Sequence, residues 1–175
     1  MTRPGIVGTF GPQRMGEKNV KKIYLTIATG FGTGFMRPAS GTWGTLVGIP
    51  AAIGLVQFNW FWYLVGTFAL FFVGVKASNV AEEHWQESDS SKIVIDEIVG
   101  YLVTMLLVPM TFWNLFWAFF VFRFFDIVKI WPARQIDRGG YGGLGVMADD
   151  VAAGVYANIV MQLLVAMGWL GCGWN

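Results

Sequence analysis

The sequence is poor in charge and contains a single cysteine and a single histidine. Charged residues make up 13% of its 175 residues, about half the share of an ordinary soluble domain. Because the formal net charge is only +1, no broad basic surface indicates a nucleic-acid partner. The lone Cys172 excludes an internal disulfide and a CxxC metal site. The lone His84 lies in the charged stretch EEHWQESD and excludes a site built from paired histidines.

What the chain has in abundance is apolar length. Hydrophobic residues make up 55% of it, including nine Trp and fifteen Phe. A helix needs roughly 20 apolar residues to cross a bilayer, and uncharged stretches approaching that length recur along the chain. They predict an all-α fold, a polytopic membrane helix bundle with about five transmembrane helices. The expected helices cover residues 42–58, 60–75, 93–109, 112–131 and 151–171.

Two segments precede these helices. Residues 1–22 are basic and rich in Gly and Pro at their start, and we expect a loosely ordered N-terminal segment. Residues 23–36 are apolar but short and glycine-rich, which predicts a short N-terminal or re-entrant helix. Residues 23–175 are then expected to form one integral-membrane domain.

The basic residues predict a direction of insertion. All twelve Lys and Arg lie in the N-terminal region, at 76–92 or at 123–138, whereas the turns at 58–60 and 109–112 carry no charge. Basic loops face the cytoplasm in most membrane proteins. Five helices then place the N-terminus inside and the C-terminus outside.

Acidic residues gather near the expected cytoplasmic ends of three of these helices. They are Asp96, Glu97, Asp126, Asp149 and Asp150. Short carboxylates cannot extend far toward water, and ionisable groups in membrane segments usually mark a functional site. Five clustered carboxylates without Cys or paired His favour a bound Mg²⁺, with Mn²⁺ as an alternative.

Arg123, Asp126 and Lys129 are spaced three apart and share a helical face. A simple ladder of ion pairs explains these three residues but leaves the other acids unpaired. Together with a metal, Arg123 and Lys129 have the chemistry to bind a phosphate. Water or one of the Asp residues would then attack the phosphorus.

Adjacent helical residues point about 100° apart. Asp149 and Asp150 are therefore expected to have different tasks. One would bind the metal, and the other would cap the last helix or hold a metal-bound water.

Two glycine-rich stretches accompany the acids. GYGGLG at 140–145 follows no predicted strand, so we interpret it as a flexible loop over a substrate, with Gly142 and Gly143 in contact with it. The stretch at 30–45 contains Ser40 and Thr42. It is predicted either as an anion-binding nest of backbone N–H groups or as a tightly packed turn.

Four motifs in this order resemble the phosphatidylglycerophosphatase A family. They are PASGTWGT (38–45), IVIDEIVG (93–100), FRFFDIVK (122–129) and GGLGVMADDVAAG (142–154). The resemblance implies a multi-pass protein of the bacterial cytoplasmic (inner) membrane with its active site on the cytoplasmic side. It implies Mg²⁺-dependent removal of the terminal phosphate of a membrane phospholipid, phosphatidylglycerophosphate, to give phosphatidylglycerol. Ser40, Thr45 and Ile130 depart from the family pattern.

The matched motifs carry over a set of site residues. Those expected to bind metal are Asp89, Asp96, Glu97, Asp126, Asp149 and Asp150. Those expected to act in catalysis are Arg123, Asp126, Lys129 and Asp150. Arg123 and Lys129 are also expected to contact the substrate, together with Ser40, Thr42, Gly142 and Gly143 of the two glycine-rich stretches.

A small ion-coupled transporter or channel subunit is the main alternative, with the carboxylates as a cation path. Such a path requires ionisable groups at the bilayer midplane. The middles of the expected helices, near residues 50, 67, 103, 118 and 160, carry none. A purely structural subunit leaves the acids unexplained, and the sequence indicates no oligomeric state.

The predicted orientation has a direct test. Cys172, near the end of the chain, should react with a membrane-impermeant thiol reagent added to intact spheroplasts. Labelling that requires lysis would contradict the predicted direction of insertion.

Overall fold

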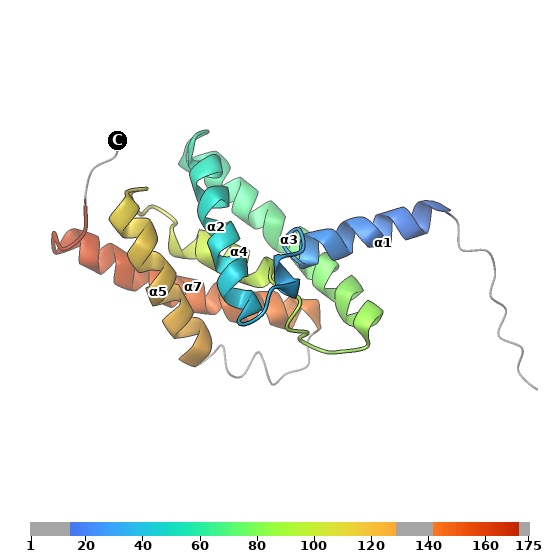
Figure 1. Ribbon diagram of the computed structural model, residues 1–175. Helices are drawn as coiled ribbons and strands as arrows, with labels where there is room; N and C mark the ends of the chain where they lie inside the picture. Colours follow the sequence, from blue (N-terminus) through green and yellow to red (C-terminus); the bar gives the residue numbers. More distant parts are fainter. Residues whose placement is uncertain (1–14, 129–141, 172–175) are drawn as a thin grey trace, which may run out of the picture.

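The described part of the chain is a bundle of helices without strands. The computed structural model describes residues 15–128 and 142–171 (Figure 1). Its elements are α1 (Met15–Ala28), the short 3₁₀ helix η1 (Thr33–Phe35), α2 (Ser40–Val56), α3 (Trp60–Trp85), α4 (Ile95–Thr104), α5 (Phe112–Val128) and α7 (Gly143–Ala166). The expected all-α fold is confirmed within these ranges. Lys129, Cys172 and residues 139–141 lie outside the described residues.

The five expected apolar helices correspond to α2, α3, α4, α5 and α7, but several boundaries differ. Helix α3 continues to Trp85, and α7 begins at Gly143 rather than near residue 151. Helix α1 passes through residue 22, the expected end of the N-terminal segment, without a break. By length and composition, α3 and α7 are the two helices in the described ranges that are able to cross a membrane.

Helix α4 is the main departure from the five-span expectation. It has ten residues, or about 15 Å of helix at 1.5 Å per residue, against a hydrocarbon layer of about 30 Å. All but two of its residues are buried, because α2, α3, α5 and α7 pack around it. Helix α4 is therefore the centre of the bundle and cannot cross a bilayer by itself.

The closest approach to α4 comes from α7, and small residues permit it. A Cβ on Gly154 would lie 2.4 Å from the carbonyl oxygen of Gly100. Glycine at this position lets the two backbones touch, as small residues do in packed membrane helices. This contact sets which residues of α4 lie beside the start of α7.

The carbonyl groups at the end of α4 receive side-chain donors from other helices. The Asn158 amide donates to the oxygens of Thr104 and Leu106, at 2.9 and 2.7 Å, and the Tyr63 hydroxyl donates to Leu102 at 2.9 Å. The last carbonyls of any helix lack partners within it, and such groups are costly to bury in an apolar environment. These donors explain how α4 ends inside the bundle.

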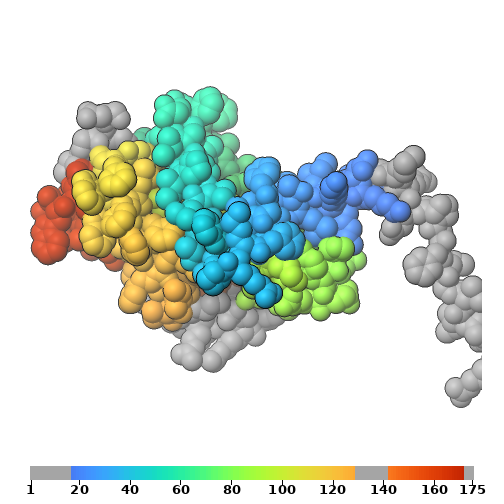
Figure 2. All heavy atoms as spheres, viewed as in Figure 1, coloured from blue at the N-terminus to red at the C-terminus, as the bar shows by residue number. Residues whose placement is uncertain are grey.

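The outer faces of the bundle are apolar. Exposed large hydrophobic side chains include Phe68, Phe72, Trp113, Phe120, Ile159 and Leu163, on α3, α5 and α7. Figure 2 shows one side of the bundle, with α5 beside α2 and with α1 extending away from both. Exposed apolar surface on this scale is typical of contact with lipid or with another protein.

The N-terminal region packs against the start of α4. The Val94 backbone N–H donates to the Ala28 carbonyl at 2.9 Å, which joins the end of α1 to the residue before α4. The expected short element at 23–36 thus consists of the end of α1, a turn and η1. It braces the end of α4 that carries Asp96 and Glu97.

Replacing Asn158 by Leu tests how α4 ends. The Thr104 carbonyl would lose its donor from α7 and the Leu106 carbonyl the shorter of its two, and an unsatisfied buried polar group costs about 1–3 kcal/mol. We expect a clear fall in the unfolding temperature of the detergent-solubilised protein. Gln162→Leu is the comparison variant. Gln162 is exposed and donates to Leu106 over a longer 3.4 Å and to Asn158 Oδ1 at 3.1 Å, and its removal leaves the donors of the Asn158 amide in place. Equal unfolding temperatures for wild type and Asn158→Leu would show that these bonds do not stabilise the fold.

Candidate functional site

The first turn of α4 carries two adjacent acids, Asp96 and Glu97. Carboxylates are favoured there because the unpaired N–H groups of a helix start carry partial positive charge. Asp96 is 8% exposed and Glu97 is partly buried. Both therefore lie within the protein, at the end of α4 that the N-terminal region covers.

Helix α7 adds a third carboxylate to these two. Asp150 is 5% exposed, and one oxygen from each of Asp96, Glu97 and Asp150 lies within 4.8 Å of the others. We call these three residues the carboxylate triad. Oxygens on opposite sides of an octahedral Mg²⁺ are about 4.2 Å apart, from bond lengths near 2.1 Å. The triad thus has nearly the dimensions of a cation's coordination shell.

Asp149 occupies a different place from its neighbour. It is buried, at 6% exposure, but is not a member of the triad. Because α7 begins at Gly143 and Gly142 occupies its N-cap position, Asp149 lies inside the helix and does not cap it. Of the two tasks expected for the second acid, capping this helix is therefore excluded, and holding a metal-bound water stays a prediction. The divergence of the two side chains follows from helix geometry.

Arg123 on α5 is the basic residue of the site. Its guanidinium forms an ion pair with Asp126 one turn along α5 and lies 3.9 Å from a Glu97 oxygen. The predicted contact between Arg123 and Asp126 is present, and Arg123 also connects α5 with α4. Asp126 in turn lies within hydrogen-bonding reach of Asp150.

The triad carries more negative charge than its described surroundings balance. Asp96 Oδ1, Glu97 Oε2 and Asp150 Oδ2 are buried without a hydrogen-bond partner among the described residues. Arg123 is the one described cation that forms an ion pair with any member. Buried charges are normally paired or bound to metal, and hard cations such as Mg²⁺ prefer oxygen ligands. The triad therefore fits a divalent cation and could hold one.

Asp89 approaches this cluster from the loop between α3 and α4. Its N–H donates to Glu82 Oε1 at 2.8 Å, and its carboxylate is near enough to Asp96 for mutual repulsion. Asp89 is not part of the triad. In the same loop, hydrogen bonds from Ser90 and Lys92 lower the pKa of the exposed Glu87 carboxyl, so Glu87 stays ionised and holds the loop together.

The start of α2 meets the site through a residue that the sequence did not single out. The Ser40 hydroxyl donates to the Ser91 carbonyl at 2.5 Å, and Thr42 is partly buried in the same first turn of α2. Between them, a Cβ on Gly41 would lie 2.2 Å from Glu97 Oε1 and 2.9 Å from an Arg123 nitrogen. The glycine inside the PASGTWGT motif was the signal that could have identified this contact.

The two predicted loop glycines lie at the start of α7. Gly142 has φ of +58°, a conformation that favours glycine, and Gly143 is the first residue of the helix. The Gly143 N–H donates to Asn79 Oδ1 on α3 at 2.9 Å. Asn79 is a second contact that sequence reasoning missed, because its partner lies 64 positions away.

Comparisons with known proteins agree on one family. Residues 26–165 match the phosphatidylglycerophosphatase A family. The phosphatidylglycerophosphatase A of Haemophilus influenzae is 38% identical over 84% of this chain and 95% of its own length. The Escherichia coli protein of the same name is 34% identical over 79% of this chain and 81% of its own.

A third relative has a different name. A candidate phosphatidylinositol-3-phosphatase of Bacteroides thetaiotaomicron is 43% identical over 79% of this chain and 91% of its own length. No solved structure matches the chain.

Gly41→Ala tests the contact between α2 and the site. The added methyl must displace Glu97 or Arg123, and changes of this kind at ligand-supporting positions typically cost 10–100-fold in metal affinity. We expect Mn²⁺ binding, followed by electron paramagnetic resonance, to weaken by at least about tenfold. Gly54→Ala is the control, because a Cβ at Gly54 on the same helix meets nothing within 4 Å. Equal Mn²⁺ affinity in both variants would show that Gly41 does not shape the site.

Proposed function

This chain belongs to the phosphatidylglycerophosphatase A family, and we propose that it uses a divalent cation at the carboxylate triad to hydrolyse the terminal phosphate of phosphatidylglycerophosphate. The family supports the phosphatase activity and the phospholipid substrate. The triad is the observation that supports metal assistance, because its buried oxygens lack other partners among the described residues. Mg²⁺ is the cation that best suits an all-carboxylate site for a phosphate substrate.

Each group at the site has a task in this proposal. Asp96, Glu97 and Asp150 hold the cation, which when bound would supply positive charge against the phosphoryl oxygens. Arg123 donates to the same oxygens, and its ion pair with Asp126 sets its direction. Lys129, three residues after Asp126 in the sequence, is assigned the same role. Water attacks the phosphorus, or an Asp carboxylate does so and water then hydrolyses the resulting acyl phosphate. In both cases the bond from phosphorus to the glycerol oxygen breaks, and phosphatidylglycerol and phosphate are released. Asp126, beside both Arg123 and Asp150, is the acid proposed for this step.

The remaining predicted residues have supporting tasks. Asp149 and Asp89 lie around the triad and are proposed to hold waters of the bound cation. Ser40, Thr42, Gly142 and Gly143 are proposed to border the phosphate, with Gly143 fixed to α3 through Asn79. Domain limits at 1–22 and 23–175 remain predictions.

We further propose that the protein is embedded in the bacterial inner membrane with this site on the cytoplasmic side. Helices α3 and α7 are the spans that length supports. Helices α2 and α5, with 17 residues each, are at the lower limit for a span. Helix α4 is enclosed by its neighbours, as short helices at membrane depth must be. The charge pattern of the loops supports the direction.

The carboxylate-to-amide change Asp150→Asn tests the proposed function. It keeps the shape of the side chain while removing its charge. We expect Mg²⁺-dependent phosphate release to fall roughly 100-fold or more. Mg²⁺ should raise the unfolding temperature of the wild type, because a ligand that binds only the folded state stabilises it, and this rise should vanish in the variant. Glu83→Gln, on an exposed position of α3, is the matched control. Full activity of Asp150→Asn at limiting Mg²⁺ would refute a metal site at the triad.

The same assay decides between two headgroups. Phosphatidylglycerophosphate and phosphatidylinositol 3-phosphate should be compared at equal surface concentration in mixed micelles, since one relative carries the second name. We expect a higher kcat/KM for phosphatidylglycerophosphate. The reverse order would assign this chain the specificity that the Bacteroides protein is named for.

A further inference from the structure

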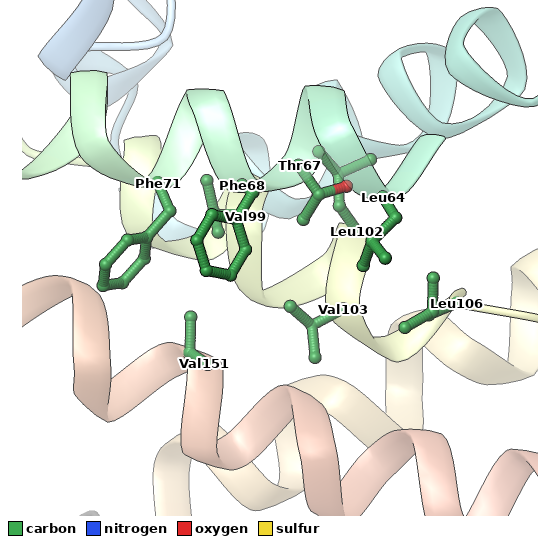
Figure 3. Close-up of a pocket in the computed structure, with 9 residues that line it drawn as sticks. All are labelled: Leu64, Thr67, Phe68, Phe71, Val99, Leu102, Val103, Leu106 and Val151. Carbon is green, nitrogen blue, oxygen red and sulfur yellow. The ribbon is translucent and has the colours of Figure 1, made fainter. Parts of the chain in front are cut away.

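An apolar cavity lies between α3, α4 and α7, beside the carboxylate triad. Its volume is about 240 Å³, and its lining residues are Leu64, Thr67, Phe68, Phe71, Val99, Leu102, Val103, Leu106 and Val151. Figure 3 shows these side chains extending from the three helices toward a shared space. The exposed lining is entirely apolar, because the Thr67 hydroxyl donates back to the Tyr63 carbonyl at 2.9 Å. We call this space the apolar groove.

The groove begins next to the triad. On α4, Asp96 and Val99 are three residues apart and share a helical face, and on α7 Val151 directly follows Asp150. Val99, Val103 and Leu106 then continue along the chain away from the triad. At 1.5 Å per residue, the four steps from Val99 to Val103 within α4 cover about 6 Å, and Leu106 follows in the turn after the helix, so the groove leads away from the acids.

The groove also opens sideways to the outside of the bundle. Leu64 and Phe68, on its α3 wall, are 48% and 63% exposed. These residues occupy the same helical face, four positions apart. A chain lying in the groove could therefore enter laterally from the surrounding lipid without crossing the polar site.

We infer that the apolar groove holds one acyl chain of the phospholipid whose phosphate is bound at the triad. This inference rests on the proposed function, because only a lipid phosphate carries an apolar chain tied to its reacting group. The groove offers no polar partner, which excludes the headgroup. Its volume is smaller than that of typical sites for drug-sized ligands, about 300–1,000 Å³, which suits part of a single chain.

The chain would act by positioning. In a bilayer, transferring a chain from lipid to an apolar groove yields packing contacts and little hydrophobic gain. Binding the acyl chain would instead orient the substrate, because a chain held between α3, α4 and α7 limits where the phosphate lies relative to Asp150 and Arg123. A displacement of about 1 Å at a reacting group can cost on the order of 100-fold in rate.

The test fills the groove from its exposed wall. Leu64→Trp adds bulk at a half-exposed position, and Val65→Trp is the control, because Val65 is the next residue on α3, is 40% exposed and does not line the groove. Each is assayed on phosphatidylglycerophosphate with long acyl chains and on an analogue with two-carbon acyl groups. We expect Leu64→Trp to lower kcat/KM for the long-chain substrate by about tenfold or more, with normal turnover of the short-chain analogue and no change in Val65→Trp.

Three other outcomes would each refute one part of the proposal. Equal losses of Leu64→Trp on both substrates would indicate a distorted site and refute a chain-specific groove. Leu64→Trp and Val65→Trp behaving alike, with an active wild type, would show that bulk lipid and not the substrate occupies the groove. A wild type that releases phosphate from neither substrate would refute the proposed function itself.

A measurement independent of activity completes the test. Phosphatidylglycerol with a photoreactive diazirine at the end of one acyl chain is bound to wild type, irradiated and mapped by mass spectrometry. Adducts should concentrate on Leu64, Phe68 and Leu106. Adducts spread evenly over the exposed faces of α5 and α7 would refute a dedicated groove.

Discussion

The structure depends on one constraint: a short helix with two acids in its first turn is buried at the centre of an apolar bundle. Helix α4 cannot reach across a membrane and is instead enclosed by α2, α3, α5 and α7. Both of its ends need partners from outside the helix, since helix termini leave backbone N–H and C=O groups without hydrogen bonds. Asn158 and Tyr63 supply donors to the carbonyl end, while the opposite end carries Asp96 and Glu97, where carboxylates suit the unpaired N–H groups of the first turn.

The chemistry of the site follows from this placement. Once the start of α4 is buried, its acids are removed from bulk water, and the close contact between Gly100 and Gly154 brings α7 and Asp150 to them. Three carboxylates with one nearby arginine leave negative charge unbalanced among the described residues and could hold a cation. The apolar groove begins beside the same acids, so the contact between α4 and α7 serves both the proposed metal site and the proposed chain site.

Such an arrangement suits an amphipathic phospholipid substrate. The phosphate of a lipid remains at headgroup depth while its chains stay in the hydrocarbon layer. Phosphomonoester hydrolysis is among the slowest uncatalysed reactions known, and charge stabilisation with positioning is the main catalytic need. A bundle that is polar at one end and apolar along its length can meet both requirements with few charged residues.

The sequence by itself determined the helical class, the approximate places of the five apolar helices and a set of candidate acids that includes the carboxylate triad. Apolar run length and scarce charge are local properties, and short acids in apolar surroundings stand out without any structure. Only the tertiary structure decided that α4 ends at Thr104, that α7 already begins at Gly143, and that Asp150 rather than Asp149 joins Asp96 and Glu97. It also identified Gly41 and Asn79 as contacts of the site and its flanking helix. These features depend on which backbones touch across many positions of sequence, and such contacts arise from packing between helices, which no periodicity within one helix encodes.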